Sequence, residues 1–258
     1  DSIEKAKTHL PRLDAVGGSS AGVFVDNRPR VASLFRGVSD SDFTEKISSM
    51  FIDLGKELEV PLSIINDGEV TALAASMSLE ENAVLGIAMG TSEATGYVDT
   101  HGRVTSWLNE LAFAPVDYSP NAPADEWSGD LGCGVQYFSQ QAVGRLIPKT
   151  SLSIDSNLGL PEKLERVQEF MENNNEEAAD VYRTIGVYLG YAVAHYATFY
   201  SIGHVLILGR VTTGKGGAII QEEASKTLAC EFPELKRRIN FHQPDEKNKR
   251  HGQAIAAA

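Results

Sequence analysis

The first candidate for chemistry is an aspartate at the end of a short β-rich run. Residues 64–75 read IINDGEVTALAA, so Asp67 stands where an apolar run ends and a helical pattern begins. A carboxylate at such a junction can hold a substrate hydroxyl and accept its proton during phosphoryl transfer, and Asn66 can orient the substrate or Asp67 itself. The alternative is structural, because Asn-Asp-Gly is a common turn and Asp is a good helix cap. On these residues alone, the structural role is the simpler interpretation.

A second candidate is a run of small residues at the tip of an expected hairpin. Residues 84–104 read VLGIAMGTSEATGYVDTHGRV, in which an apolar strand enters Gly90, Thr91 and Ser92 and a second strand follows Gly96. Amides at such a tip, together with the Thr91 hydroxyl, can donate hydrogen bonds to phosphate oxygens. The run is longer than a turn requires, which favours a phosphate-binding loop, although a loose hairpin has the same composition.

A third segment matches part of a P-loop. Residues 205–220 read VLILGRVTTGKGGAII, with Gly209, Gly214 and Lys215 in P-loop spacing between a strand and a helix. The next residue is Gly216, so the hydroxyl that binds Mg²⁺ in a P-loop is missing, and too little chain follows for the later strands of such a domain. A glycine-rich strand exit beside an adenosine and a simple connection both stay open.

The roles of three more side chains depend on what surrounds them in the fold. Glu110, next to an apolar run, can reach a sugar hydroxyl, but a solvated turn carboxylate has the same pattern. Cys133 has no cysteine nearby and is explained most simply as a small buried hydrophobe. His195 lies in an apolar helical run, which favours a core histidine over a ligand.

Strands and helices that alternate along the chain must position these residues, which predicts an α/β fold. Apolar spacing predicts a helix over 41–58 and a long helix over 176–200. Residues 184–209 carry no Asp, Glu, Lys or Arg, and the stretch is long enough to span a bilayer. Its two His, its several Tyr and Thr, and a break at 201–203 favour a buried helix followed by a buried strand.

Composition excludes some classes of function. The 258 residues carry a net charge of −12, which argues against nonspecific binding to nucleic acid or anionic membrane. A nucleotide needs only a local set of donors and is not excluded. The two cysteines, Cys133 and Cys230, match neither a disulfide framework nor a metal spacing, so a reduced cytoplasmic compartment is expected.

The order of these segments along the chain resembles the ROK family of sugar kinases and regulators, in the actin-like ATPase superfamily. The resemblance implies an α/β, two-lobed actin-like ATPase (ribonuclease H-like) fold. It implies that Asp67 is the general base and that Asn66 and Glu110 contact the sugar. ATP would lie against two loops, matched by Gly90, Thr91, Ser92 and Gly96 in one, and by Gly209, Gly214 and Gly217 in the other.

The chain also departs from the family pattern. A His that binds zinc and sugar in the family falls at Phe113, a second sugar-binding Glu falls at Val135, and Cys133 is what remains of a zinc cluster. We therefore expect no structural zinc. Two lost hydrogen-bond partners would each cost on the order of 1–3 kcal/mol, which puts glucose specificity in doubt. The family's first phosphate loop has no counterpart here: either the sequence is a fragment, which the start within a helix favours, or the loop is absent.

These observations predict ATP- and Mg²⁺-dependent phosphoryl transfer to a sugar hydroxyl in the cytoplasm, with no nucleic-acid or membrane partner. A non-catalytic sugar-binding or regulatory protein on the same scaffold is the alternative, and a P-loop-like hydrolase is a weaker one. The expected lobes are residues 1–81 and 82–249, with a helix over 250–258 returning to the first. A homodimer through the exposed face of the 176–200 helix is compatible with the resemblance.

Overall fold

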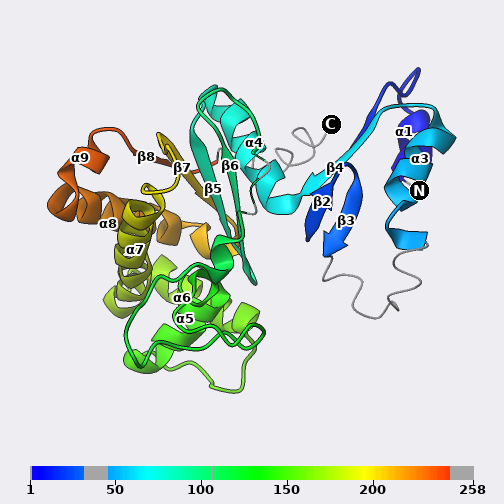
Figure 1. Ribbon diagram of the computed structural model, residues 1–258. Helices are drawn as coiled ribbons and strands as arrows, with labels where there is room; N and C mark the ends of the chain where they lie inside the picture. The colour runs from blue at the N-terminus through cyan, green and yellow to red at the C-terminus, as the bar shows by residue number, and fades with distance from the viewer. Residues whose placement is uncertain (1, 32–45, 106, 108, 245–258) are drawn as a thin grey trace.

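The computed structural model describes residues 2–31, 46–105, 107 and 109–244, and the helix expected over 250–258 lies outside them. Strands and helices form two lobes joined by strand β4 (Leu62–Asn66) and helix α4 (Asp67–Leu79), as Figure 1 shows. The predicted α/β class is confirmed. The expected boundary after Glu81 stays a prediction, and α4 packs against strands of the larger lobe.

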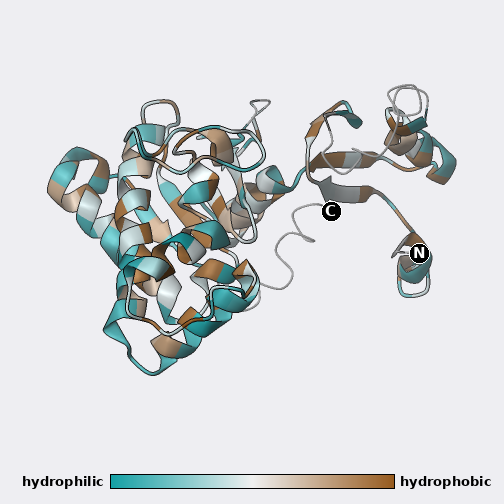
Figure 2. Ribbon diagram, turned by 90° about the horizontal axis from the view of Figure 1, so that it is seen from below, coloured by the Kyte–Doolittle hydropathy of each residue, from teal (hydrophilic) through white to brown (hydrophobic). Residues whose placement is uncertain are grey.

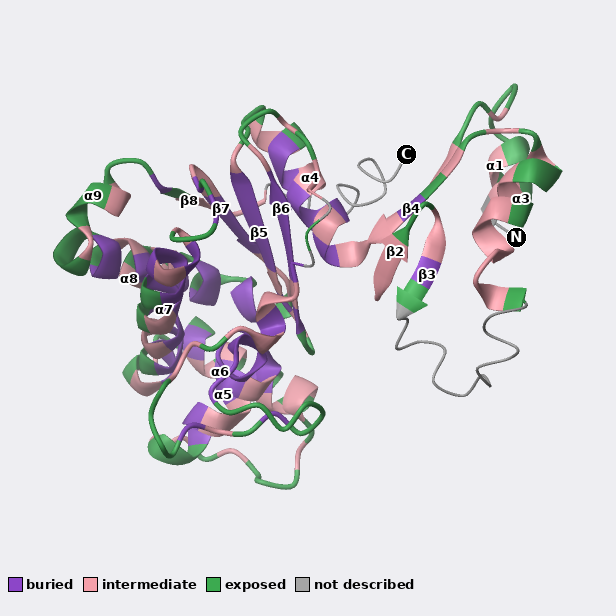
Figure 3. Ribbon diagram, in the orientation of Figure 1, coloured by how far each residue is buried: buried purple, intermediate pink, exposed green. Residues whose placement is uncertain are grey.

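The described part of the smaller lobe contains two strand pairs and the helices α1 and α3. Strand β1 (Val16–Ser20) lies parallel to β4, with Ser20 opposite Asn66, and β2 (Val23–Val25) forms a hairpin with β3 (Arg28–Val31). The helices are α1 (Ser2–Lys7) and α3 (Met50–Leu58). Helix α3 occupies the end of the helix predicted over 41–58, of which residues 41–45 lie outside the described part. Most described residues of this lobe are half-buried or exposed (Figure 3).

The larger lobe is built on a four-stranded sheet in the order β6-β5-β7-β8. Its strands are β5 (Val84–Met89), β6 (Glu93–Val98), β7 (His204–Leu208) and β8 (Asn240–His242). Strands β5 and β6 form the predicted antiparallel hairpin, and β7 runs parallel to both β5 and β8. Because strand side chains alternate between faces, Leu85 and Ile87 join the main core while Val84 packs with Ala75 of α4 on the other face.

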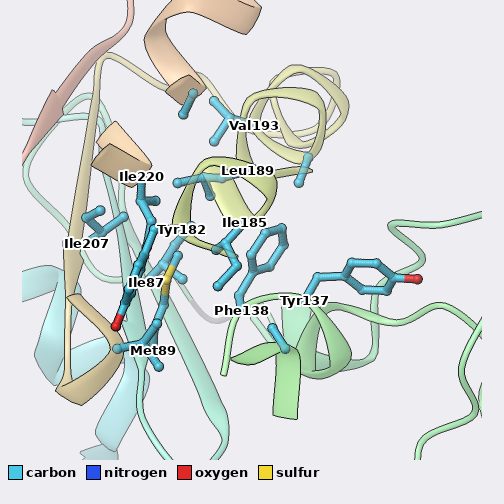
Figure 4. Close-up of a cluster of buried hydrophobic side chains, with 14 of the residues drawn as sticks. Ile87, Met89, Tyr137, Phe138, Tyr182, Ile185, Leu189, Val193, Ile207 and Ile220 are labelled. Atoms are coloured by element: carbon cyan, nitrogen blue, oxygen red, sulfur yellow. The ribbon is translucent and has the colours of Figure 1, made fainter. Parts of the chain in front are cut away.

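Helices cover the core face of the sheet. The long α7 (Glu176–Tyr196) and α8 (Lys215–Glu231) pack together, and their apolar residues join those of the sheet (Figure 4). The helices of this lobe carry both hydrophilic and hydrophobic residues (Figure 2), and most buried positions of α7 and α8 are apolar or glycine. The lobe is completed by α5 (Gln140–Leu146), α6 (Leu160–Glu172), α9 (Pro233–Lys236) and the 3-10 turns η3 (Leu111–Phe113), η4 (Gly134–Gln136), η5 (Ile147–Lys149) and η6 (Arg210–Thr212).

The uncharged stretch over 184–209 forms most of α7 and then β7, as predicted. In the part of the chain that the structure describes, no helix combines the length and the apolar content needed to cross a membrane.

Candidate functional site

The junction of β4 and α4 presents Asp67 at the first position of a helix. Asn66 is the N-cap, because its side-chain Oδ1 accepts a hydrogen bond from the Gly68 amide at 2.7 Å. Glu69 follows three residues later, at the spacing of a capping box, and the Asn66 backbone amide faces its carboxyl group. The capping role that the sequence offered as an alternative for Asp67 therefore belongs to Asn66. Asp67 is half-buried, and among the described residues its Oδ1 accepts a 3.1 Å bond from the adjacent Gly68 amide and no other.

Asn66 also ties the start of α4 to the smaller lobe. Its Nδ2 donates a 2.8 Å hydrogen bond to the Gly22 carbonyl, in the turn between β1 and β2. Both polar atoms of this side chain are thus bonded to protein. The role of Asn66 toward the substrate or toward Asp67 stays a prediction.

The tertiary structure brings Glu110 into the electrostatic range of Asp67. Burial raises the pKa of Glu110, and the negative charge of Asp67 raises it further. Burial also raises the pKa of Glu69; the bond from Asn66 opposes this shift, and the charge of Glu110 adds to it. A fourth carboxyl group, Glu93, has its pKa raised to about 8, by burial first and in smaller part by Glu110. We call Asp67, Glu69, Glu93 and Glu110 the carboxylate cluster.

Direct backbone packing holds this cluster together. A Cβ on Gly68 would overlap the Thr95 carbonyl, and a Cβ on Gly96 would overlap the Gly68 carbonyl and lie 2.7 Å from the Glu69 Cα. The first turn of α4 therefore lies on β6 with no side chain between them. Gly96, predicted to bind phosphate, stands inside β6 opposite Gly86 and contacts α4 instead of lying at the hairpin tip.

The hairpin tip itself has the properties of an anion site. Thr91 and Ser92 are exposed, and their amides form no backbone hydrogen bond among the described residues. Gly90 is anchored on both sides, since its amide donates to the Ser92 carbonyl at 3.0 Å and its carbonyl accepts from the Gln140 amide at 2.9 Å. Free amides on an anchored loop suit a phosphate group.

The exit of β7 lies against the same hairpin. Gly209 has φ 102°, and a Cβ there would come within 2.5 Å of the Met89 carbonyl oxygen, one residue before Gly90. Gly217 packs its Cα on the Thr212 carbonyl, which lets α8 pack closely on η6. Gly214, with φ 64°, borders a hollow of about 140 Å³ that the buried Tyr182 also lines.

Lys215 does not point as a P-loop lysine would. Its Nζ lies 3.4 Å from the carbonyls of Met171 and Glu172 and 3.0 Å from Asn174 Oδ1, at the end of α6. The ammonium thus binds the free carbonyls of a helix C-terminus, where a cation is favoured. This contact argues against the P-loop-like interpretation.

An apolar hollow lies elsewhere in the described part of the chain. It encloses about 620 Å³ and is lined mostly by aromatic rings, among them Trp107, Tyr196 and Phe199. None of the carboxylate cluster lines it, so we place the candidate site at the cluster, where titratable groups and free amides converge.

The positions that depart from the family pattern are filled by packing. Phe113 lies against Trp127 with ring centroids 5.3 Å apart, and Cys133 is buried beside Ala112 and Val135. Among the residues described, no His, Cys, Asp and Glu side chains group in a way that could hold a metal ion.

Two members of the carboxylate cluster, Glu69 and Glu93, were not predicted from the sequence. Glu69 stands three residues after an Asn, which is the capping-box spacing, so it could have been found. Glu93 is the acidic residue that directly follows the hairpin tip, at the start of a strand with small and apolar residues. An acid at this position is a signal that the sequence offers, but the burial of Glu93 depends on segments that are distant in sequence.

Comparison with known proteins supports the fold through structure alone. No protein-family model and no curated protein sequence matches this chain. A ROK family transcriptional regulator, a homologue of the E. coli MLC protein, matches with a TM-score of 0.70 and 16% identity, over 99% of this chain and 65% of that one. The chain thus spans less than two thirds of that regulator's length.

Two kinase structures match similarly. The ROK hexokinase from Thermus thermophilus has a TM-score of 0.67 and 18% identity, over 95% of this chain and 79% of that one. A ROK family glucokinase from Streptomyces griseus, in complex with glucose and AMPPNP, has a TM-score of 0.68 and 18% identity, over 100% of this chain and 85% of that one. The chain shares the fold of ROK structures over nearly its whole length, which confirms the predicted actin-like ATPase fold.

Proposed function

We propose that this protein transfers a phosphoryl group from ATP to a hydroxyl of a sugar, with Mg²⁺. The observation that carries the proposal is the packing of Gly68 on β6. It places Asp67 one residue from the strand that begins directly after the hairpin tip. Thr95, which touches Gly68, follows Ser92 by three residues, or about 10 Å of strand. A carboxylate beside β6 and a set of free amides at the tip that precedes this strand suit a hydroxyl acceptor and a phosphate donor.

Each residue then has a distinct role. Asp67 accepts the proton of the attacking hydroxyl, and Asn66 fixes the helix end from which Asp67 projects. Glu110 accepts a hydrogen bond from a second hydroxyl. The amides of Thr91 and Ser92 donate to phosphate oxygens, and Gly90, Gly209 and Gly214 let the backbone approach the nucleotide; Gly96 and Gly217 support this site through packing. ATP would supply the phosphoryl group, and Mg²⁺ would neutralise its charge.

A sugar-binding or regulatory protein on this scaffold is the second candidate. The apolar Phe113 and Val135 favour it, because they offer no hydrogen bond to a sugar hydroxyl. The structural match with a transcriptional regulator supports the same alternative.

The proposal also covers the oligomeric state and the compartment of the protein. We propose a homodimer, with the exposed Val187 and Tyr191 of α7 in its interface. A reduced, cytoplasmic compartment suits the free thiols of Cys133 and Cys230.

The test is ADP release by the full-length protein with ATP and Mg²⁺, across hexoses, amino sugars and polyols. Asp67→Asn should lower turnover by at least about 100-fold, as expected for the loss of a general base. Asp53→Asn is the matched control, because Asp53 lies in the first turn of α3 and is exposed. Unchanged turnover in Asp67→Asn would refute the role of Asp67. Sugar or ATP binding without turnover would favour the regulatory candidate.

A further inference from the structure

Tyr200 lies between α7 and β7, and its side chain is bonded to the residue that precedes Glu110. The Tyr200 hydroxyl donates a 3.1 Å hydrogen bond to Asn109 Oδ1. Both side chains are buried, with 9% exposure for Tyr200 and 6% for Asn109. The Nδ2 of Asn109 has no hydrogen-bond partner in the described part of the chain. Among the described residues, the bond from Tyr200 therefore holds the Asn109 side chain by itself.

The ring of Tyr200 is in turn fixed against β6. Its centroid lies 5.0 Å from that of Tyr97, a buried residue of β6, and the two rings meet edge to face. The Tyr97 hydroxyl donates a 3.0 Å hydrogen bond to the carbonyl of Ser201, the residue after Tyr200. Trp107 packs on the Tyr200 ring at 5.8 Å. These contacts leave the Tyr200 hydroxyl little freedom to move relative to the strand.

The backbone on the other side of Glu110 also lies beside β6. The Leu111 amide donates a 3.0 Å hydrogen bond to the Asn109 carbonyl, so Glu110 stands in a tight turn at the start of η3. A Cβ at Gly134 would come within 2.5 Å both of the Leu111 carbonyl oxygen and of Oε2 of Glu93, the first residue of β6. Glu110 is thus held between two anchored residues, one on each side.

We propose that Tyr200 is a positioning residue, which fixes the backbone from which Glu110 reaches the sugar by holding Asn109. This inference rests on the proposed function, in which Glu110 accepts a hydrogen bond from a sugar hydroxyl. Without the Tyr200 hydroxyl, the buried Asn109 side chain would lose its partner, and the turn that carries Glu110 would relax. A contact that depends on exact placement then weakens.

Strand β6 connects this role to the other side of the site. Successive residues of a strand face opposite sides of the sheet, so Tyr97 faces the core and Gly96 faces α4. Gly96 sets the position of the helix start that carries Asp67, and Tyr97 sets that of the Tyr200 ring. One strand therefore determines where both the proposed base and the proposed sugar contact stand.

The positioning role is tested with the sugar found in the turnover panel. Tyr200→Phe keeps the ring and removes only the hydroxyl. KM for the sugar should rise about 3- to 10-fold, the range for loss of one hydrogen bond, and kcat should change less than about twofold, because Glu110 contacts the sugar before and during transfer alike. An unchanged KM would overturn the role.

Tyr97→Phe is the matched control. It removes a buried hydroxyl from the same aromatic pair, with its bond to the Ser201 carbonyl, and leaves the bond between Tyr200 and Asn109 intact. KM should stay at the wild-type value in this variant. An equal rise of KM in both variants would show a general loosening of the core and would refute a specific role of Tyr200.

A double variant tests whether Tyr200 acts through Asn109. Asn109→Ala should raise KM as Tyr200→Phe does, and the two changes together should raise it little further, because both remove the same bond. Fully additive effects would contradict the inference.

The placement of Glu110 can also be measured without any ligand. In protein labelled with ¹³C at the glutamate carboxyl carbons, the Glu110 signal is assigned by its loss in Glu110→Gln. This signal should shift in Tyr200→Phe and stay in place in Tyr97→Phe. An unmoved signal overturns the positioning role whatever the activity of the protein. A wild-type protein that neither binds nor converts any sugar refutes the proposed function, and the carboxyl signal then decides by itself whether Tyr200 positions Glu110.

Discussion

Gly68 and Gly96 touch through their backbones, which is why a helix start and a strand from different parts of the chain form one site. Gly68 follows Asp67 at the start of α4, and Gly96 lies within β6, which begins directly after the hairpin tip. Gly86, opposite Gly96 on β5, leaves room for Ala72 of the same helix. The distance from Asp67 to the tip is therefore determined by main-chain contacts, which side-chain rotation cannot relax.

A side chain at Gly96 should separate these elements. We expect Gly96→Ala to lower the free energy of unfolding by about 1–3 kcal/mol, because the new Cβ overlaps backbone atoms of Gly68 and Glu69. Urea denaturation measures this change. Gly90→Ala in the same hairpin is the control, since its Cβ would have no neighbour closer than 3.6 Å. Equal stability of the two variants would contradict the close packing.

Loss of Asn66 should affect both the helix and the site. Asn66→Ala removes the N-cap of α4 and should cost about 0.5–2 kcal/mol of stability. It also removes the bond to Gly22, so kcat should fall as Asp67 loses its fixed orientation. Asn175→Ala provides the comparison, because Asn175 caps α7 through its bond to the Ala178 amide. Thermal melting should detect a loss in both variants, and turnover should fall only in Asn66→Ala. A parallel fall in Asn175→Ala would show a general folding effect.

Lys215 should matter for stability and not for nucleotide binding. Lys215→Met removes the cation at the end of α6 and should cost about 0.3–1 kcal/mol. Calorimetry should show an unchanged Kd for ATP, because the ammonium is bound to α6. Lys226→Met, on the exposed face of the same helix, controls for the loss of charge. A large loss of ATP affinity confined to Lys215→Met would restore the P-loop-like interpretation.

Stability should depend on pH through Glu93. Its pKa in the folded state is about 8, above its usual value of 4.5, so between these values the folded protein keeps a proton that the unfolded chain has released. The contribution of Glu93 is complete below pH 4.5 and decreases as pH rises toward 8, by up to about 1.4 kcal/mol per pH unit. Denaturation of wild type and Glu93→Gln from pH 5 to 9 isolates this contribution. We expect the variant to gain in relative stability as pH rises, and parallel curves would refute the buried acid.

The local pattern of the sequence determined the elements that carry the site. The apolar run from Val84 into the small residues at 90–92 predicts the hairpin, and the uncharged run over 184–209 predicts a buried helix followed by a strand. Asp67 at a strand-to-helix junction and the small residues at 90–92 were also visible, because turn and cap preferences depend on adjacent residues. These features need no knowledge of the rest of the fold.

Only the tertiary structure decided how these parts act together. It assigned the cap to Asn66 and left Asp67 at the helix start, it gave Gly96 to packing, and it turned Lys215 toward α6. It also buried Glu93 and brought Glu110 near Asp67. Burial and charge coupling depend on which distant segments fill the space around a side chain, and no periodicity in the sequence records that. The sequence therefore supplies the groups that can do chemistry, and packing determines their charge and orientation.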